Sequence, residues 1–191
     1  DYKKKLNITI FGASGTIGNY LIDNFQKDNH NLLLFIKDKK KLLKLKKIIK
    51  PNVNQIINFE QFDITKKNSI KNKIYKNRKF IKKTDILINT IAEQGEINNF
   101  FKIDIKKFIK TFEVNFFSNI FLFKNLYKFI KLNKNLLIIL FSGGGVTNVR
   151  KNFSSYSLSK IALVKLVEIL SLEFNNKSIR INAISPGIIN S

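Results

Sequence analysis

Tyr156 and Lys160 stand at positions i and i+4, so that on a helix their side chains lie on one face. A tyrosine with a pKa near ~10 is a poor proton carrier at neutral pH. A nearby ammonium group stabilises the phenolate and lowers that pKa, and the pair can then exchange a proton with a carbonyl or an alcohol. The predicted chemistry is proton transfer at an oxygen bound to carbon.

This spacing is not specific in a chain so rich in lysine, since Tyr75 and Tyr127 also precede a lysine by four positions. Position in the chain distinguishes the three tyrosines. Tyr156 follows an apolar run that ends in the Phe-Ser-Gly-Gly-Gly sequence of residues 141–145, and we expect this run to be a strand. Its carboxyl end is the edge where Rossmann-type sheets bind ligands. The other two tyrosines fall inside helical patterns and are expected at the surface.

A second motif is the Gly-Ala-Ser-Gly-Thr-Ile-Gly sequence of residues 12–18, which we call the glycine turn. It lies between an apolar run and a helical pattern, an order that suits the pyrophosphate of a dinucleotide. Glycines permit a close approach of backbone to phosphate, and the helix aims free N–H groups and the positive end of its dipole at the charge. We therefore expect a dinucleotide at Gly12, Ser14, Gly15, Thr16, Ile17 and Gly18.

The end of the second predicted strand indicates which dinucleotide is bound. Enzymes that prefer NAD place an acidic residue there, which binds the ribose 2′-hydroxyl. Here that place holds Ile36, followed by Lys37, and Ser14 lies in the glycine turn. A cation suits a 2′-phosphate, so we predict a preference for NADP(H). NAD(H) is retained as the alternative, because Asp38 follows directly.

These residues must be positioned by alternating strands and helices. Apolar runs predict strands at 6–11, 31–36, 55–62, 85–90, 136–142 and 178–184. Helical patterns lie between them at 16–27, 39–49, 67–81, 106–132 and 156–174. Such alternation favours a parallel sheet covered on both faces, wound by right-handed crossovers into a Rossmann-like α/β sheet of six strands. With no internal repeat or linker, we predict a single domain over residues 1–191.

Composition excludes some functions. The net charge is +22, but arginine occurs only at positions 78, 150 and 180, and lysine is spread through the chain. Base readout and bidentate phosphate contacts favour arginine, so nucleic acid is not expected as a partner. The chain has no Cys, which is compatible with the cytoplasm, where we expect the protein, and no stretch predicts a membrane span. His30, expected in an exposed turn, has no second histidine with which to bind a metal.

Taken together, the motifs resemble those of the short-chain dehydrogenase/reductase family, in the family's order and across nearly all of the chain. The resemblance rests on the glycine turn, residues 62–65, 88–95 and 114–115, the pair Tyr156 and Lys160, and residues 185–191. It implies an NADP(H)-dependent oxidoreductase that transfers a hydride between nicotinamide and a carbonyl or alcohol substrate. The later motifs fit the shorter branch of the family better than the extended one.

The resemblance also implies a role for individual residues. Tyr156 would give or take the proton, and Lys160 would lower the pKa of Tyr156 and hold the ribose hydroxyls. Asn115 would hold a water that links Lys160 to solvent. Beyond the glycine turn, the implied cofactor-binding residues are Lys37, Asp63, Ile64, Asn89, Lys160, Pro186, Gly187, Ile189 and Ser191.

Two departures from the family's pattern matter. The catalytic serine of the family lies thirteen residues before the tyrosine, where this chain has Gly143. We assign carbonyl polarisation to Ser142, one position earlier, with Ser154 and Ser155 as weaker candidates. The glycine turn itself is spaced as in the extended branch, which contains nucleotide-sugar epimerases and dehydratases.

The ends and faces of the chain carry two further expectations. Family members continue beyond a point equivalent to Ser191 with a substrate-covering segment and a last strand, so we expect the given chain to be C-terminally incomplete. The helical patterns at 106–132 and 156–174 are apolar on more than one face, which predicts burial against a second copy in a homodimer or homotetramer.

Three alternative functions remain open at this point. The glycine spacing allows a nucleotide-sugar epimerase or dehydratase whose bound cofactor is unchanged over a cycle. Gly143 and the early end of the chain allow a catalytically weak protein that only binds NAD(P). The third is a basic nucleic-acid-binding protein, whose affinity would fall steeply with salt.

Overall fold

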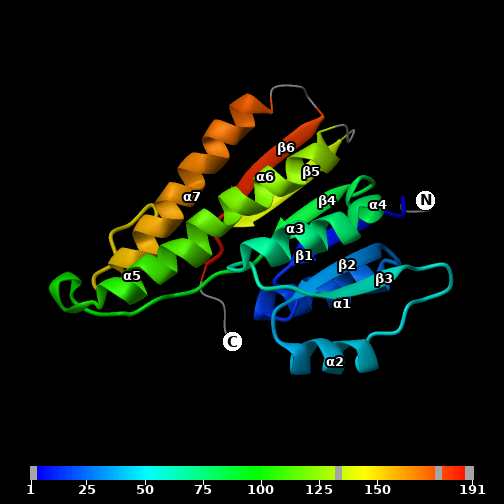
Figure 1. The fold of residues 1–191 in the computed structure, drawn as a ribbon, viewed down its shortest axis with the longest axis horizontal. Helices are drawn as coiled ribbons and strands as arrows, with labels where there is room; N and C mark the ends of the chain where they lie inside the picture. The colour runs from blue at the N-terminus through cyan, green and yellow to red at the C-terminus, as the bar shows by residue number, and fades with distance from the viewer. Residues whose placement is uncertain (1–3, 132–134, 175–177, 188–191) are drawn as a thin grey trace.

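A computed structural model describes residues 4–131, 135–174 and 178–187. Within these residues six parallel strands form one sheet in the order β3-β2-β1-β4-β5-β6 (Figure 1). The strands are β1 (Asn7–Phe11), β2 (Asn31–Ile36), β3 (Ile57–Gln61), β4 (Ile86–Asn89), β5 (Leu136–Phe141) and β6 (Ile179–Ile184). This arrangement confirms the predicted Rossmann-like α/β fold.

Helices cover both faces of the sheet. They are α1 (Thr16–Lys27), α2 (Lys39–Ile48), α3 (Lys67–Lys76), α4 (Arg78–Ile81), α5 (Ile105–Phe112), α6 (Ser118–Ile130) and α7 (Ser154–Glu173). One apolar cluster packs α1 and α2 on one face, and a larger one packs α3, α4, α6 and α7 on the other (Figure 1). Among the described helices, none is long and apolar enough to cross a membrane.

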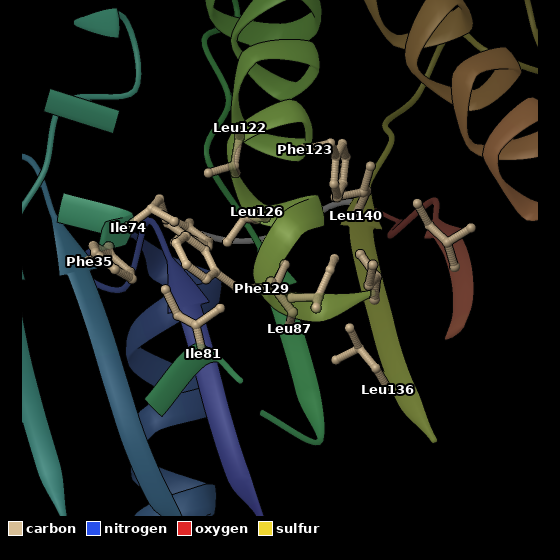
Figure 2. Packing of buried hydrophobic residues seen from close by; sticks show 14 of the residues in the cluster. Phe35, Ile74, Ile81, Leu87, Leu122, Phe123, Leu126, Phe129, Leu136 and Leu140 are labelled. Atoms are coloured by element: carbon tan, nitrogen blue, oxygen red, sulfur yellow. The ribbon is translucent and has the colours of Figure 1, made fainter. Parts of the chain in front are cut away.

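The strands are buried because helices lie on both sides of them. In β2, every residue from Leu32 to Ile36 is buried. On the larger-cluster face, Leu122, Leu126 and Phe129 of α6 lie in one apolar cluster with Leu87 of β4 (Figure 2). Each such side chain contributes roughly 1.5–3 kcal/mol when it is fully buried. The unbroken apolar runs in the sequence are therefore the signature of central parallel strands.

The strand order reverses at β1, which lies between β2 and β4. Phe11 at the end of β1 is in register with Phe35 of β2 on one side and with Asn89 of β4 on the other. In open α/β sheets, ligands bind at such a switch point, outside the carboxyl ends of the strands. The glycine turn follows β1 directly, so the topology places it at this point.

The predicted helix at 106–132 is interrupted. A π-helical turn, η2 (Glu113–Phe117), separates α5 from α6. Asn115, in the middle of this turn, is fully buried and directs its amide toward the segment that follows β4. The predicted helix at 67–81 likewise divides at Asn77 into α3 and α4. Helix interruptions of this kind depend on tertiary contacts. The apolar pattern of the sequence continues through them unchanged, so it does not predict them.

Candidate active site

Two cavities lie along the carboxyl edge of the sheet. The first, of about 280 Å³, lies beside the glycine turn and the ends of β2, β3 and β4. The second, of about 590 Å³, lies beside the start of α1, the segment after β5 and the start of α7. Gly15, Thr90 and Ala92 line both cavities. The two spaces therefore adjoin across the switch point, as an extended dinucleotide requires.

The glycine turn is shaped by two close backbone approaches. Gly12 has a φ of +81°, and a Cβ there would lie 2.6 Å from the hydroxyl oxygen of Thr90. A Cβ on Gly18 would lie 2.5 Å from the carbonyl oxygen of Gly12 and 2.7 Å from that of Ala13. Both positions therefore require glycine, and the turn packs tightly against the start of α1 and the end of β4.

The start of α1 is open to an anion. Gly15 is its N-cap residue, and no side chain caps this end of the helix. The first N–H groups of a helix have no partner within it, and Gly15, Thr16 and Ile17 line the second cavity. Uncapped donors and a positive dipole end that face a cavity fit a bound pyrophosphate.

Asn89 and Thr90 fix the backbone below the cavities. The Thr90 hydroxyl donates to the carbonyl oxygens of Phe11 and Gly12, at 3.1 Å each. The buried Asn89 side chain donates to Oδ1 of Asn119 at 2.7 Å and accepts the N–H of Ile91 at 3.0 Å. Asn89 thus holds the segment after β4 from below and does not line either cavity.

Lys37 and Asp63 meet at the rim of the first cavity, where Lys37 Nζ lies 3.5 Å from Asp63 Oδ2. Burial acts to raise the pKa of Asp63, but hydrogen bonds from Thr65 and the charge of Lys37 outweigh it and leave the pKa lowered. Asp38 does not compete for this place, because its carboxylate caps α2 by accepting the N–H of Lys41 at 2.8 Å. A cation therefore stands at the end of β2.

The Tyr156 side chain lies against the glycine segment after β5. A Cβ at position 143 would overlap the Tyr156 hydroxyl, so this position faces the hydroxyl directly. Ser142 is buried and lines the same cavity, and its hydroxyl has no hydrogen-bond partner in the described part of the chain. The structure therefore does not bring Ser142 into hydrogen bonding with Tyr156. A buried hydroxyl without a partner costs about 1–3 kcal/mol, a cost that a bound carbonyl could offset.

Lys160 is almost completely buried beneath this tyrosine. Its Nζ donates to the carbonyl oxygen of Phe141 at 2.7 Å and lies 5.7 Å from the centre of the Tyr156 ring. Burial lowers the pKa of Lys160 to about 8. Burial also raises the pKa of Tyr156, and the charge that opposes this rise belongs to Arg150. The Lys160 ammonium group is bonded to the Phe141 carbonyl in this arrangement, and its predicted effect on the pKa of Tyr156 stays a prediction.

Asn115 is a central member of a buried amide network. Its Oδ1 accepts the N–H of Glu93 at 2.8 Å, and its Nδ2 donates to the Glu93 carbonyl at 2.8 Å and to the Ser159 hydroxyl at 3.0 Å. The Ser159 hydroxyl donates in turn to the Tyr156 carbonyl at 2.7 Å. Asn115 thus ties the segment after β4 to the first turn of α7, and its predicted role in holding a water stays a prediction.

The predicted site residues are placed as follows. Those lining one or both cavities are Gly12, Ser14, Gly15, Thr16, Ile17, Lys37, Asp63, Ile64, Ser142, Tyr156, Lys160, Pro186 and Gly187. Gly18, Asn89 and Asn115 support the site from below. Ile189 and Ser191 lie outside the described residues. No cluster of metal-ligating side chains occurs in the described ranges.

Sequence reasoning missed other residues that line the second cavity, namely Thr90, Ala92, Gln94, Arg150 and Phe153. Arg150 carried a signal, since arginine is rare in this lysine-rich chain.

The expectation for His30 was wrong. It is buried, and its Nδ1 accepts the N–H of Leu6 at 3.3 Å, because the turn that contains it packs against Phe25. Tyr75 and Tyr127 are exposed, as expected.

Comparisons with known proteins agree with this geometry. NADPH-dependent aldehyde reductase 1 of Arabidopsis thaliana, a chloroplastic protein, is 32% identical over 107 residues, which are 55% of this chain and 36% of that protein. The NAD-dependent glycerol dehydrogenase of Listeria innocua is 27% identical over 199 residues, which are 98% of this chain and 74% of that protein. The match to the first relative thus covers only about a third of its length.

Solved structures share the whole fold. The structure of ElxO with NADP bound superposes with a TM-score of 0.88 at 23% identity, over 98% of this chain and 75% of that one. A sequence profile of the family described as short chain dehydrogenase matches residues 6–191. The chain belongs to the short chain dehydrogenase family.

Proposed function

We propose that this protein is an NADP(H)-dependent oxidoreductase that interconverts a carbonyl compound and its alcohol. The observation that carries the proposal is the Tyr156 hydroxyl. It lies in a cavity above the buried Lys160, and that cavity continues to the uncapped start of α1. A proton donor and a dinucleotide site thus share one space. Relatives named as aldehyde reductase and glycerol dehydrogenase support this class of reaction.

The residues of the two cavities divide the cofactor between them. The first turn of α1 would hold the pyrophosphate, Asp63 and Ile64 the adenine, and Lys37 with Ser14 a 2′-phosphate. The nicotinamide end would be held by residues that follow β6 in the sequence, namely Pro186, Gly187, Ile189 and Ser191. When bound, NADP(H) supplies or accepts the hydride.

The chain's own residues move the proton. Tyr156 donates it to the carbonyl oxygen in reduction and takes it back in oxidation. Ser142 polarises that oxygen through its unpartnered hydroxyl. Lys160, with its pKa lowered to about 8, exchanges protons near neutral pH and holds the ribose hydroxyls once they replace the Phe141 carbonyl. Asn115 keeps the first turn of α7 in place through Ser159.

The proposed preference for NADP(H) rests on charge at the end of β2. Lys37 stands there, and the neighbouring carboxylate of Asp38 is used as a helix cap. The relatives include both an NADPH-dependent and an NAD-dependent protein, so they do not decide the matter. The expected cytoplasmic location likewise stays a prediction.

We also propose that the protein forms at least a homodimer through α5, η2, α6 and α7. Apolar side chains remain at least two-fifths exposed on three of these elements, namely Ile105, Ile109, Phe117, Leu158, Ile161, Ile169 and Leu172. A monomer would leave this surface in water, and contiguous apolar patches of that kind mark interaction sites.

The reaction is tested by incubating the protein with NADPH and each of a panel of aldehydes and ketones. Turnover is measured as the loss of NADPH absorbance. Tyr156→Phe keeps the ring but removes the proton donor, so it is expected to abolish turnover while NADPH still binds. Tyr127→Phe, on the exposed face of α6, is the matched control and should leave turnover unchanged. Full turnover in Tyr156→Phe would refute the assigned role.

One observation favours a second candidate function. Position 143, which faces the Tyr156 hydroxyl, carries no side chain, so the hydroxyl that would assist the tyrosine from there is missing. The same assay separates this candidate, a catalytically weak NAD(P)-binding protein, from the first. Tight NADPH binding without turnover on any carbonyl in the panel would support it.

A further inference from the structure

Arg150 lies at the mouth of the active site and has no role in the reaction described above. It belongs to the segment between β5 and α7 and lines the second cavity together with Tyr156. Its guanidinium carbon lies 3.8 Å from the centre of the Phe153 ring, a stacked position that holds the long side chain in place. One of its terminal nitrogens would lie 3.8 Å from a Cβ on Gly144.

The charge of Arg150 stands without a carboxylate partner in the part of the chain that the structure describes. None of the residues that line the second cavity is acidic. The other cation in that lining is Lys160, whose ammonium group is already bonded to the Phe141 carbonyl. Arg150 therefore presents an open set of donors to the cavity.

This charge lies close to the reacting group. Position 143 faces the Tyr156 hydroxyl and position 144 faces the Arg150 guanidinium, and consecutive Cα atoms are about 3.8 Å apart. The guanidinium is also near enough to act on Tyr156, since its charge opposes the rise that burial causes in the tyrosine pKa. Tyr156 and Arg150 line the same cavity, so a substrate that reacts at Tyr156 can reach Arg150 with another of its groups.

Two other roles for Arg150 fit the structure less well than substrate binding does. A solvated surface arginine needs no cavity, but this one lines the cavity that contains Tyr156. Binding of the cofactor's pyrophosphate is the second, but the uncapped start of α1 already supplies donors for that group. The guanidinium fork is suited to a carboxylate or phosphate, which it binds through two parallel hydrogen bonds.

We propose that Arg150 binds an anionic group of the substrate, so that the compound reacting at Tyr156 is an oxo acid, a hydroxy acid or a phosphorylated carbonyl compound. The inference rests on the proposed oxidoreductase function. Arg150 acts here as a specificity-determining residue, because it orients the substrate and takes no part in proton or hydride transfer.

The test compares matched charged and neutral substrates. The rates of NADPH-dependent reduction of a 3-oxo carboxylate and of its methyl ester are measured, together with a carbonyl phosphate ester and its dephosphorylated counterpart. In Arg150→Gln, kcat/KM for the anionic member of a pair is expected to fall at least about tenfold more than for the neutral one. Arg150→Lys should retain part of the preference. The control is Arg180→Gln, on the exposed side of β6, which removes the same charge elsewhere.

A larger loss of kcat/KM for the 3-oxo carboxylate than for its ester identifies the bound anion as a carboxylate. A larger loss for the carbonyl phosphate ester than for its dephosphorylated counterpart identifies it as a phosphate. Equal losses on both members of each pair would overturn the proposal. So would a weaker affinity for NADPH in Arg150→Gln, because it would assign the arginine to the cofactor.

Binding of saturated, unreactive carboxylates and phosphate monoesters to the NADP-bound protein gives a readout that does not require turnover. If the wild-type protein reduces nothing in the panel, the proposed function fails. Calorimetry then decides the inference alone. Anion binding that disappears in Arg150→Gln supports it, and binding that is absent or unaffected by the substitution overturns it.

Discussion

Two lysines of the site differ in environment, and the difference separates their roles. The side chain of Lys37 is 72% exposed and forms an ion pair with Asp63, whereas Lys160 is buried. An exposed ammonium remains charged and available to a ligand phosphate. A buried one has lost solvation and responds to pH within the ordinary working range of an enzyme.

Lys37→Glu is expected to reverse the cofactor preference. The substitution removes the cation beside the proposed 2′-phosphate site and places a carboxylate there, next to Asp63. The affinity for NADPH should fall about tenfold or more, while that for NADH should stay the same or rise. Calorimetric titration with each cofactor measures both, with Lys124→Glu on the exposed side of α6 as the matched control. Wild-type protein that binds NADH as tightly as NADPH would refute the assignment.

Lys160 predicts a pH dependence of stability. Because burial lowers its pKa from 10.5 to about 8, the unfolded chain binds more protons than the folded one between these values. Below pH 8 the lysine is charged in both states, and the cost of burying the charge is at its full value. As the pH rises from about 8 to 10.5, this cost disappears, and folding gains about 3 kcal/mol.

Urea unfolding of wild type and of Lys160→Met, each at neutral pH and near pH 10, measures this gain. The difference in free energy of unfolding, wild type minus variant, should increase with pH. A difference that does not change with pH would mean that the pKa of Lys160 is not lowered in the folded protein.

The elements of the fold were predictable where local pattern decides them. Each observed strand lies within its predicted range. The inner strands read as apolar runs because helices cover both of their faces, whereas the edge strand β6 alternates between buried and more exposed residues. The glycine turn was also predictable from local sequence, since its backbone requires glycine at positions 12 and 18.

What the sequence could not predict depends on contacts between distant segments. The π-helical turn exists because the Asn115 amide bonds to Glu93, 22 residues away. The direction of the Lys160 ammonium, toward the Phe141 carbonyl at the end of β5, depends on how α7 packs beside β6. Arg150 lies in an irregular segment with no periodicity, so that only its residue type pointed to it.

At this scale the glycine turn gives a matched pair of substitutions. In Gly18→Ala the new Cβ would press on the backbone of Gly12 and Ala13, which has no flexible end that could move aside. We expect a loss of stability of about 1–3 kcal/mol or more, together with loss of NADPH binding. In Gly15→Ala the nearest atom is the Gly12 carbonyl oxygen at 3.5 Å, an ordinary contact, so stability should be unchanged.

Thermal unfolding and NADPH titration of the two variants separate folding from binding. Gly15 lines both cavities, so Gly15→Ala should lower the affinity for NADPH while the melting temperature stays at the wild-type value. Equal stability of Gly18→Ala and wild type would mean that the turn is looser than the close approach of Gly18 to Gly12 implies.

The whole molecule combines a strongly positive charge with an exposed apolar surface, and these act in opposite directions on self-association. The net charge of +22 repels a second copy. On α7, however, Leu158 and Ile161 lie one turn apart, as do Ile169 and Leu172, and all four are more than 40% exposed. The exposed ion pair of Lys165 and Glu168 lies between these two apolar pairs. Salt screens the repulsion without weakening the apolar contact.

We therefore expect association that strengthens from low to moderate salt, the reverse of what binding to nucleic acid would show. Light scattering at micromolar concentration should give at least a dimer in moderate salt. Ile161→Glu places a charge beside Leu158 in the apolar surface of α7 and should give a monomer. Ile48→Glu, on the exposed side of α2, makes the same change outside the proposed interface and should leave the dimer intact. A wild-type monomer across this salt range would reject the interface, and the apolar surface would then require another partner.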